Sequence, residues 1–279
     1  MSPSVFVARL SAGAAIALCS FARAGVTTDL VASSNLGGET TFNNVNAALG
    51  VPPATTSFGA TTPFNPNFGS DNIVRILPGG QITLRLSSPA PIDNTSAPEL
   101  GVFTNIGLQD VSADGSGVAG NPAQPFSALP VARVRISDDN VNWHDVAGGA
   151  LVTFRMIENG YTDTPPYTNY FATPGTTLAD VYKAPPSAVR AAGLSAFNGM
   201  SFTQALAALD GSAGGEWIDL SGLGLTSFRY VRFEVPAGLD PVDNRMILDA
   251  ITAVPEPSII GMLLLGALSL SRKRRSERR

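Results

Sequence analysis

Short stretches in which apolar and polar residues alternate, separated by turns rich in glycine and proline, make up the centre of this 279-residue sequence. In the stretch 131–137, for example, Val134 and Ile136 alternate with two arginines. A period of two places one set of side chains on each face of a β-strand, whereas a helix needs a period of about 3.6. The 28 glycines and 21 prolines would also interrupt long helices. The pattern therefore predicts a mainly β fold.

Further stretches of the same kind predict the other strands. These are 73–77, 81–86, 101–111, 143–146, 151–157, 217–220, 228–235 and 246–252. Pro78, Gly79 and Gly80 separate the first two stretches, so we expect those two to form a hairpin.

Residues 25–72 lack a sustained period and are rich in Thr, Asn, Gly and Ser. We expect a loop-rich N-terminal segment there, with one or two edge strands, that packs on the body of the protein. The aromatic residues expected to hold it to the core are Phe42, Phe58, Phe64 and Phe68.

Helical periodicity is confined to about 186–210, which predicts two short helices. Ser201 and Gln204 have the spacing of a capping box at the start of the second. No internal repeat of fixed length is present, which argues against a solenoid or a propeller. The sequence thus predicts a β-sandwich of the jelly-roll type over 73–253, with a short helical insertion.

The first 24 residues have the three parts of a secretory signal peptide. Arg9 supplies the positive charge, residues 10–22 form an apolar stretch, and Ala22 and Ala24 fit an A-x-A cleavage pattern. An ordinary buried helix is the alternative. The chain's one cysteine lies inside this segment, so the mature protein would lack cysteine.

The C-terminal residues 254–279 also have three parts. A short motif is followed by an apolar stretch at 259–270 and then by a basic tail. The motif consists of Val254, Pro255, Glu256, Pro257 and Ser258, and the tail begins with Arg272, Lys273, Arg274 and Arg275. As a helix the apolar stretch would measure about 18 Å, short of the roughly 30 Å of a bilayer core. The basic tail is expected to stay in the cytoplasm.

This C-terminal arrangement resembles the PEP-CTERM sorting signal of Gram-negative bacteria. The resemblance implies that an exosortase, a membrane-embedded processing enzyme, recognises and cleaves the segment. It further implies transient anchoring in the inner membrane and then release to the cell surface or to an extracellular polysaccharide matrix. A permanent single-pass anchor is the alternative, although it would favour a longer apolar stretch.

Removing both ends changes the charge of the protein. Residues 25–253 keep 10 of the 18 Lys and Arg residues and 20 of the 22 Asp and Glu residues, which gives a net charge of 10 − 20 = −10. Such a body would repel nucleic acid and anionic membranes. Neutral sugars, cations and other surface proteins remain as partners.

A second resemblance lies within the body. Residues 134–143, which contain a turn at Asp139 and Asn140, look like a hairpin of discoidin-like, galactose-binding-type jelly rolls. Residues 228–233 and 248–251 look like the last two strands of those domains. Asn140 stands where the family commonly has glycine, and asparagine also tolerates the left-handed conformation of such a turn. These motifs maintain a fold and imply no particular ligand.

The sequence offers little catalytic chemistry. His144 is the only histidine, and its neighbour Asp145 would point to the opposite face of a strand, which argues against a Ser-His-Asp triad. The spacing of Asp138, Asn140 and Asn142 begins like an EF-hand loop, but the later ligand positions fail. We therefore expect no cofactor, except that a looser calcium site could use loop aspartates. The candidates are Asp71, Asp110, Asp114 and Asp243.

Aromatic side chains are the best candidates for ligand contacts. Tyr161, Tyr167 and Tyr170 lie in an expected surface loop and could stack on sugar rings, whereas Trp143 and Trp217 are expected in the core. We therefore expect an exported, non-enzymatic cell-surface or matrix protein that contacts carbohydrate. The alternative is a secreted glycan-active hydrolase that uses two loop carboxylates.

Overall fold

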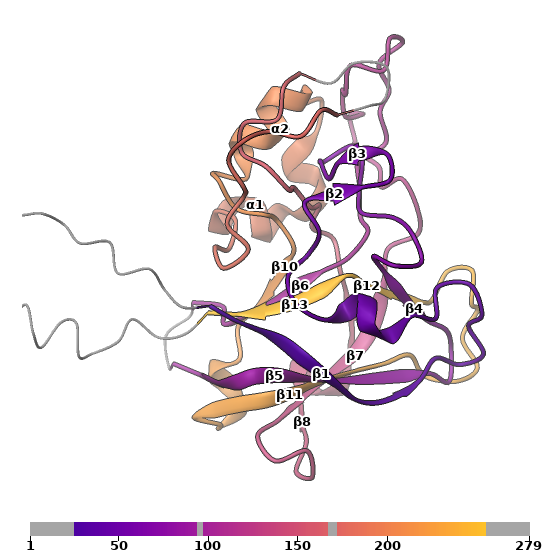
Figure 1. Ribbon diagram of the computed structural model, residues 1–279, viewed down its shortest axis with the longest axis vertical. Coiled ribbons are helices and arrows are strands. Elements are labelled where there is room, and N and C mark those ends of the chain that lie inside the picture. Colours follow the sequence, from indigo (N-terminus) through magenta and orange to yellow (C-terminus); the bar gives the residue numbers. More distant parts are fainter. Residues whose placement is uncertain (1–24, 94–96, 167–171, 255–279) are drawn as a thin grey trace, which may run out of the picture. The chain divides into compact units, whose positions relative to one another are not determined.

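The computed structural model describes residues 25–93, 97–166 and 172–254 (Figure 1). The predicted signal peptide and the segment from Pro255 onward lie outside these residues. The strands are β1 (Val26–Asn35), β2 (Thr55–Thr56), β3 (Gly59–Ala60), β4 (Val74–Ile76), β5 (Gln81–Pro91), β6 (Leu100–Phe103), β7 (Val131–Ser137), β8 (His144–Asp145), β9 (Leu151–Thr153), β10 (Glu216–Ile218), β11 (Ser227–Glu234), β12 (Met246–Leu248) and β13 (Ala250–Ala253). The predicted mainly β character is confirmed.

Two α-helices lie in the region where helical periodicity was predicted. They are α1 (Ser187–Ala192) and α2 (Phe202–Ala208), and a 3-10 turn (Gly193–Phe197) follows the first. At the start of α2 the side-chain oxygen of Gln204 accepts a hydrogen bond from the Ser201 backbone amide at 2.9 Å, as the capping-box spacing predicts. Further 3-10 turns cover Val45–Ala48, Val146–Gly149 and Ser221–Leu223. Within the described residues, no helix is both long enough and apolar enough to cross a bilayer.

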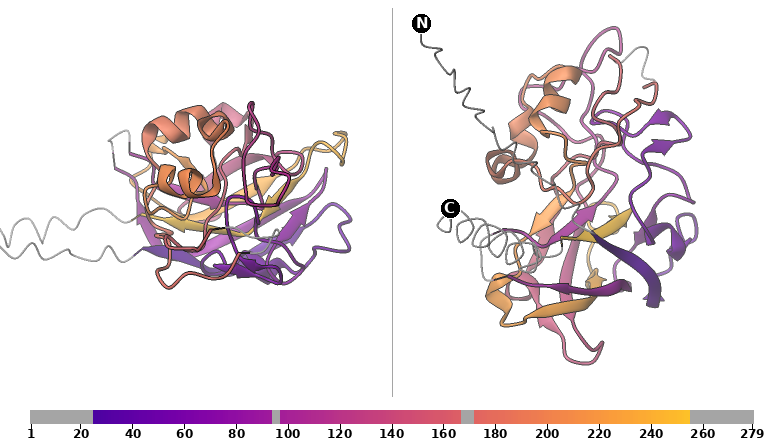
Figure 2. Two further views of the ribbon diagram at one scale, coloured as in Figure 1. Left: turned by 90° about the horizontal axis from the view of Figure 1, so that it is seen from above. Right: turned by 60° about the vertical axis from the view of Figure 1, so that its left-hand side comes forward.

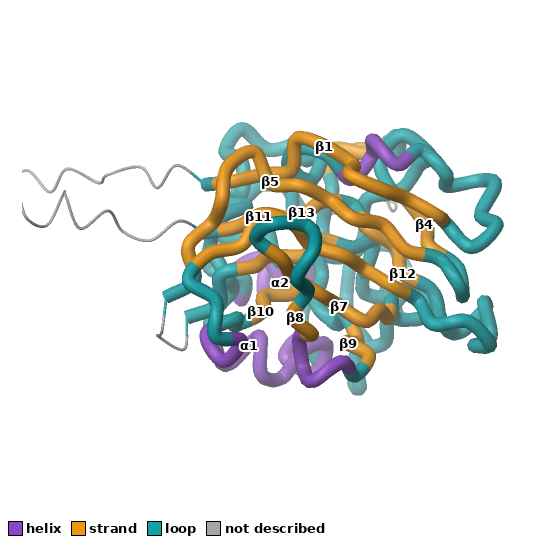
Figure 3. Tube along the Cα trace, turned by 90° about the horizontal axis from the view of Figure 1, so that it is seen from below, coloured by secondary structure: helices purple, strands orange, loops and turns teal. Residues whose placement is uncertain are grey.

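Nine strands form one antiparallel network in the order β10-β6-β13-β1-β5-β11-β7-β8, with β9 also paired to β7. The first residues of β1, Val26 and Thr27, pair with β13, while its later residues pair with β5. Figure 3 shows β1, β5, β11 and β7 running side by side in one part of the network. β1 therefore joins this part to the part formed by β10, β6 and β13.

Residues 25–72 contain one long strand, β1, and the two short strands β2 and β3. Val26 and Thr27 pair with β13, and Thr28–Asn35 pair with β5, so β1 lies at an edge of each part of the network. The register of β1 against β5 shifts twice, between Thr28 and Leu30 and between Val31 and Ser33. These irregularities break the alternation of side chains along the strand, which is why the period-2 signal was missing.

The hairpin predicted between 73–77 and 81–86 is wrong, although both stretches contain strands. β4 pairs with β12, and β5 pairs with β1 and β11. The turn after β4 is made by a hydrogen bond from Gly80 N–H to the Leu77 carbonyl. Gly79 then donates to Val235, at the end of β11, which carries the chain away from β4.

The core lies between the two parts of the network and extends under the helices. Ile82, Leu84 and Leu86 of β5 are fully buried, as their alternation predicts. Phe202 and Leu209 of the helical region belong to the same apolar cluster. Figures 1 and 2 show α1 and α2 on the side of β10 and β6, away from β5 and β11.

Asp249 divides a stretch that was predicted as one strand. β12 ends at Leu248 and β13 begins at Ala250, and the two strands pair with different partners, β4 and β6. The Asp249 backbone N–H donates to the Phe103 carbonyl at 3.0 Å. A fully buried acid thus stands where the chain passes from one strand pair to the other.

Candidate functional site

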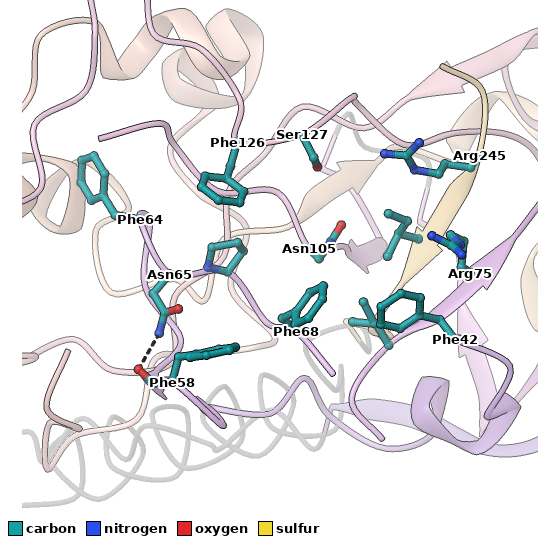
Figure 4. Close-up of a pocket in the computed structure, with 13 residues that line it drawn as sticks. Phe42, Phe58, Phe64, Asn65, Phe68, Arg75, Asn105, Phe126, Ser127 and Arg245 are labelled. Carbon is teal, nitrogen blue, oxygen red and sulfur yellow. Dashed lines mark hydrogen bonds between the residues drawn. The ribbon is translucent and has the colours of Figure 1, made fainter. Parts of the chain in front are cut away.

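An aromatic cleft is the most distinctive cavity of the described part of the protein. Its volume is about 410 Å³, which falls within the range of small-molecule sites. Five phenylalanines line it, and they are Phe42, Phe58, Phe64, Phe68 and Phe126. Polar side chains also reach it, from Asn65, Arg75, Asn105, Ser127 and Arg245. Figure 4 shows Phe58 and Phe126 toward one end of the cavity and the two arginines together at the other.

Three of these rings are unusually accessible to solvent. Phe126 is 72% exposed, Phe58 is 49% exposed and Phe68 is 46% exposed, whereas Phe64 is buried. The expectation that the N-terminal phenylalanines hold their segment to the core is therefore right for Phe64 and wrong for Phe58 and Phe68. Exposed phenylalanine rings that gather around one cavity are typical of a binding surface.

Loops present the aromatic rings. Phe58 occupies the turn between β2 and β3, where the Asn65 side chain donates to the Phe58 carbonyl at 3.2 Å. Phe68 packs edge-on against Phe42, with ring centroids 5.4 Å apart. The guanidinium of Arg75, on β4, lies 5.0 Å from the centroid of the Phe42 ring. A chain of ring contacts thus orders one wall of the cleft.

Arg75 is already neutralised by a buried acid. Its Nε donates to the carboxylate of Glu39, which also accepts the backbone N–H groups of Thr41 and Phe42. Burial alone would raise the pKa of Glu39, but these hydrogen bonds outweigh it and lower the pKa from 4.5 to about 2. Arg75 therefore fixes the cleft wall and adds little net charge to it.

Arg245 and Asn105 have unused hydrogen-bonding capacity. One amino group of Arg245 donates to the Val242 carbonyl, but its Nε is buried and has no partner within the described residues. Asn105 is also buried, and its Oδ1 is likewise without a partner in that part of the chain. A donor and an acceptor that both lack partners line the same cavity. Buried polar groups seldom remain unpaired, so this pair indicates a ligand with hydroxyl or carbonyl groups.

Among the tyrosines predicted to contact ligand, Tyr161 is described by the structure and does not line this cleft. Tyr161 is half-buried and packs against the main core. Tyr167 and Tyr170 lie outside the described residues, so their role stays a prediction. The residues that sequence reasoning missed are Phe126, Asn105 and Arg245. For Phe126 the available signal was an isolated aromatic residue in a Gly- and Pro-rich loop without strand periodicity.

Three of the four aspartates suggested for calcium occupy turns, and the fourth, Asp110, forms an isolated β-bridge with Ala119. Asp110 accepts hydrogen bonds from the backbone N–H groups of Ser112, Gly117 and Val118, which use both of its oxygens. Asp114 accepts one from Ser116, and Asp71 and Asp243 are exposed. Among residues 25–93, 97–166 and 172–254, no group of three or more His, Cys, Asp or Glu side chains could hold a metal ion.

His144 and the two tryptophans also have defined surroundings. The carboxylate of Asp145 pairs with Arg135 at 2.8 Å, and His144 is half-buried. Trp217 is buried, and its ring N–H donates to the Gly214 carbonyl at 2.9 Å. The prediction of a core position is thus confirmed for Trp217. It is wrong for Trp143, which is only half-buried.

Val254, the first residue of the predicted sorting motif, is the last residue that the structure describes. The Val254 backbone N–H donates to the Glu99 carbonyl at 3.0 Å, directly after β13. The remainder of the motif and the basic tail that begins at Arg272 lie outside the described residues, as do Ala22 and Ala24 at the predicted signal-peptide cleavage site.

The comparisons with known proteins do not assign the chain to a family. No protein-family model matches the sequence, and a search of curated proteins finds no match.

Proposed function

We propose that this protein is an exported cell-surface or extracellular-matrix protein whose body binds carbohydrate in the aromatic cleft. One observation carries the proposal. Exposed rings of Phe58, Phe68 and Phe126 line one cavity together with two buried polar groups, on Asn105 and Arg245, that have no partner within the described residues.

Carbohydrate fits this combination of groups. A sugar ring has an apolar face of C–H groups, which packs on aromatic rings, and hydroxyl groups, which need both donors and acceptors. Asn105 Oδ1 can accept from a hydroxyl and Arg245 Nε can donate to one. Arg245 also suits a sugar carboxylate, because Arg75 is neutralised by Glu39, whereas Arg245 has no ion pair with an Asp or Glu of the described residues.

The sorting part of the proposal rests on the two ends of the sequence. The resemblance to a PEP-CTERM signal implies cleavage by an exosortase-type enzyme after transient anchoring in the inner membrane. The position of Val254 supports this proposal, because the motif starts immediately after the last strand. Cleavage beyond Val254 would leave every described strand in place.

We assign the finer architecture as a jelly-roll sandwich. Its support is the shared strand β1 and the single apolar cluster that contains residues from both parts of the network, such as Leu100 and Ile251 on one side and Ile82 and Val134 on the other. The turn at Asn140, which has a φ of 63°, is consistent with the resemblance to discoidin-like domains.

Binding to a panel of neutral and uronic-acid oligosaccharides, followed by calorimetry, tests the carbohydrate proposal. We expect Phe126→Ala and Phe58→Ala to lower affinity about tenfold each and to leave the melting temperature unchanged, because both rings are exposed. Val141→Ala is the matched control, since Val141 is 76% exposed and does not line the cleft. Equal affinity in all three variants would place binding elsewhere.

Two further measurements address the remaining parts of the proposal. Mass spectrometry of the secreted protein should find a C-terminus upstream of Arg272, and an intact Arg279 would rule out processing. A hydrolysis screen on the same oligosaccharides should find no turnover. Turnover that a single Asp or Glu substitution abolishes would support the hydrolase alternative instead.

A further inference from the structure

The aromatic cleft differs in charge from the body that contains it. Residues 25–253 have 20 Asp and Glu residues against 10 Lys and Arg residues. The described residues that line the cleft nevertheless include two arginines, Arg75 and Arg245, and no acid. The carboxylate that neutralises Arg75 belongs to Glu39, which does not line the cleft. The cleft therefore presents cationic side chains in a protein that is otherwise acidic.

Arg245 carries the charge that is left unpaired in the cleft. It makes no ion pair with an Asp or Glu of residues 25–93, 97–166 and 172–254. Its Nη1 donates to the Val242 carbonyl, while its Nε and Nη2 donate to no group in those ranges. Nε and Nη2 lie on one edge of the planar guanidinium, and their N–H bonds point in the same direction. One whole edge of Arg245 thus remains for a ligand.

Arg85 shows what such an edge binds in this protein. Its Nε and Nη2 donate to the two carboxylate oxygens of Asp29, at 3.0 Å and 2.9 Å. Two parallel bonds of this kind match the planar geometry of a carboxylate, and they are stronger than hydrogen bonds between neutral groups. Arg245 has the same edge, but no carboxylate of the described chain pairs with it. A carboxylate on the ligand would complete the same arrangement in the cleft.

Asn105 and the phenylalanines require more of the ligand than a carboxylate. The buried Asn105 Oδ1 accepts no hydrogen bond in the described part of the chain, so it needs a donor such as a hydroxyl group. Figure 4 shows Asn105 between Phe126 and Arg245. The exposed rings of Phe58 and Phe126 favour contact with an apolar surface. These groups together match a ligand that combines a carboxylate, hydroxyl groups and a face of C–H groups.

We propose that the cleft selects acidic sugars, with the carboxylate of a uronic acid bound to Arg245 and a ring hydroxyl bound to Asn105. This inference rests on the proposed carbohydrate-binding function and names the class of sugar. A neutral sugar would leave the free edge of Arg245 without an anion, whereas a uronic acid pairs with it. A sulfated sugar shares the negative charge, but the pairing of Arg85 with Asp29 favours a carboxylate as the group bound.

Calorimetric titration of the full-length protein with matched trisaccharides tests the inference. The ligands are trimers of galacturonic, glucuronic and mannuronic acid, each compared with its own methyl ester, which keeps the hydroxyl groups and removes the charge. A sulfated galactose trimer is the second kind of anion. We expect at least one uronic acid trimer to bind about tenfold or more tightly than its ester in dilute salt. This preference should shrink in about 0.5 M NaCl, because salt screens the charge of the accessible guanidinium.

Substitutions of Arg245 connect the preference to this residue. Arg245→Gln should lower the affinity for the preferred acid trimer about tenfold or more and change the affinity for its ester less than about twofold. Arg245→Lys keeps the charge but not the planar edge, so it should retain only part of the preference. The melting temperature of each variant shows whether it folds.

Arg190→Gln is the matched control. Arg190 is half-buried on α1, its Nε donates to the Pro185 carbonyl at 3.1 Å, and it does not line the cleft. Its replacement also removes one arginine charge and one hydrogen bond to a backbone carbonyl, but it should change neither affinity.

The possible results separate this inference from the function on which it rests. Equal affinity for every acid trimer and its ester would overturn the inference and leave the cleft as a site for neutral sugars. A preference that survives in Arg245→Gln, or binding of the sulfated trimer without binding of any uronic acid, would overturn it as well. Absence of binding by every trimer and ester would contradict the proposed function itself. If Arg245→Gln does not fold, the comparison of acid with ester in the unmodified protein still decides the matter.

Discussion

The guanidinium of Arg232 lies 4.0 Å from the centroid of the Trp143 ring. Arg232 belongs to β11, and Trp143 belongs to the turn that joins β7 to β8. The Nε of Arg232 also donates to Thr83 on β5 at 2.9 Å. One arginine thus ties the outer face of two neighbouring strands to a surface turn. This contact explains why Trp143 is half-buried without belonging to the core.

A double-mutant cycle should measure this contact. Arg232→Met and Trp143→Leu each remove the interaction of the cation with the ring, and we expect a coupling energy of about 0.5–1 kcal/mol between them. Arg232→Met alone should cost about 1–3 kcal/mol, because buried Thr83 then loses its partner. Urea denaturation provides the values. Arg229→Met, on the same strand, is the control, and its effect should simply add to that of Trp143→Leu.

The strands with regular alternation could be predicted from the sequence, but their partners could not. β7 and β11 appear where the period-2 pattern places them, because alternation reports burial of one face. The pairing of β4 with β12 joins Val74 to Leu248, and no local signal links residues so far apart. β1 carries no period-2 signal, since its register shifts against β5 disrupt the alternation of side chains.

The candidate sites were harder to predict than the fold. Loops form most of the aromatic cleft. Loop sequences have no regular alternation of apolar and polar residues, so the sequence does not indicate which of their side chains lie together. Asn105 and Arg245 are ordinary polar residues in the sequence, and only the fold places both at one cavity. Of the aspartates suggested for calcium, Asp110 and Asp114 instead accept hydrogen bonds from backbone N–H groups. The candidate sites therefore depend mainly on which side chains the fold brings together, and the sequence alone does not show this.

Glu39 should make stability depend on pH. Its pKa falls from 4.5 in the unfolded chain to about 2 in the folded protein. The folded state therefore binds fewer protons, and the stabilisation is complete above pH 4.5 and is lost as the pH falls through 2. Glu39→Gln should cost on the order of 3 kcal/mol at pH 7 and remove this part of the pH dependence. Chemical denaturation between pH 2 and pH 7 provides the comparison.

Glu234→Gln is the matched control for that experiment. Glu234 pairs with Arg133 at 3.5 Å on the surface, so its loss should cost less than about 1 kcal/mol. If Glu39→Gln is no more destabilising than Glu234→Gln at pH 7, the buried pair with Arg75 does not stabilise the fold.

The capping box of α2 should contribute measurably to stability. Ser201→Ala removes the side-chain oxygen at the start of this short helix, and we expect a loss of about 1 kcal/mol in urea denaturation. Thr203→Ala is the control, because Thr203 is exposed in the first turn and alanine favours helix there. A larger loss for Thr203→Ala than for Ser201→Ala would contradict the role of the cap.

Gly214 should be the least replaceable of the glycines that have a positive φ. Its φ is +81°, and a Cβ added there would lie 2.0 Å from the Ile157 carbonyl oxygen, beside Glu158. Gly238 has a similar φ of +83°, but nothing lies within 4 Å of an added Cβ. Gly238→Ala should therefore cost only the backbone strain, about 1–2 kcal/mol. Gly214→Ala adds a clash with backbone that cannot move aside, and we expect it to cost at least about 3 kcal/mol or to prevent folding. Thermal unfolding of the two variants makes the comparison, and equal melting temperatures would mean that the packing of Gly214 against Ile157 and Glu158 is looser than the structure indicates.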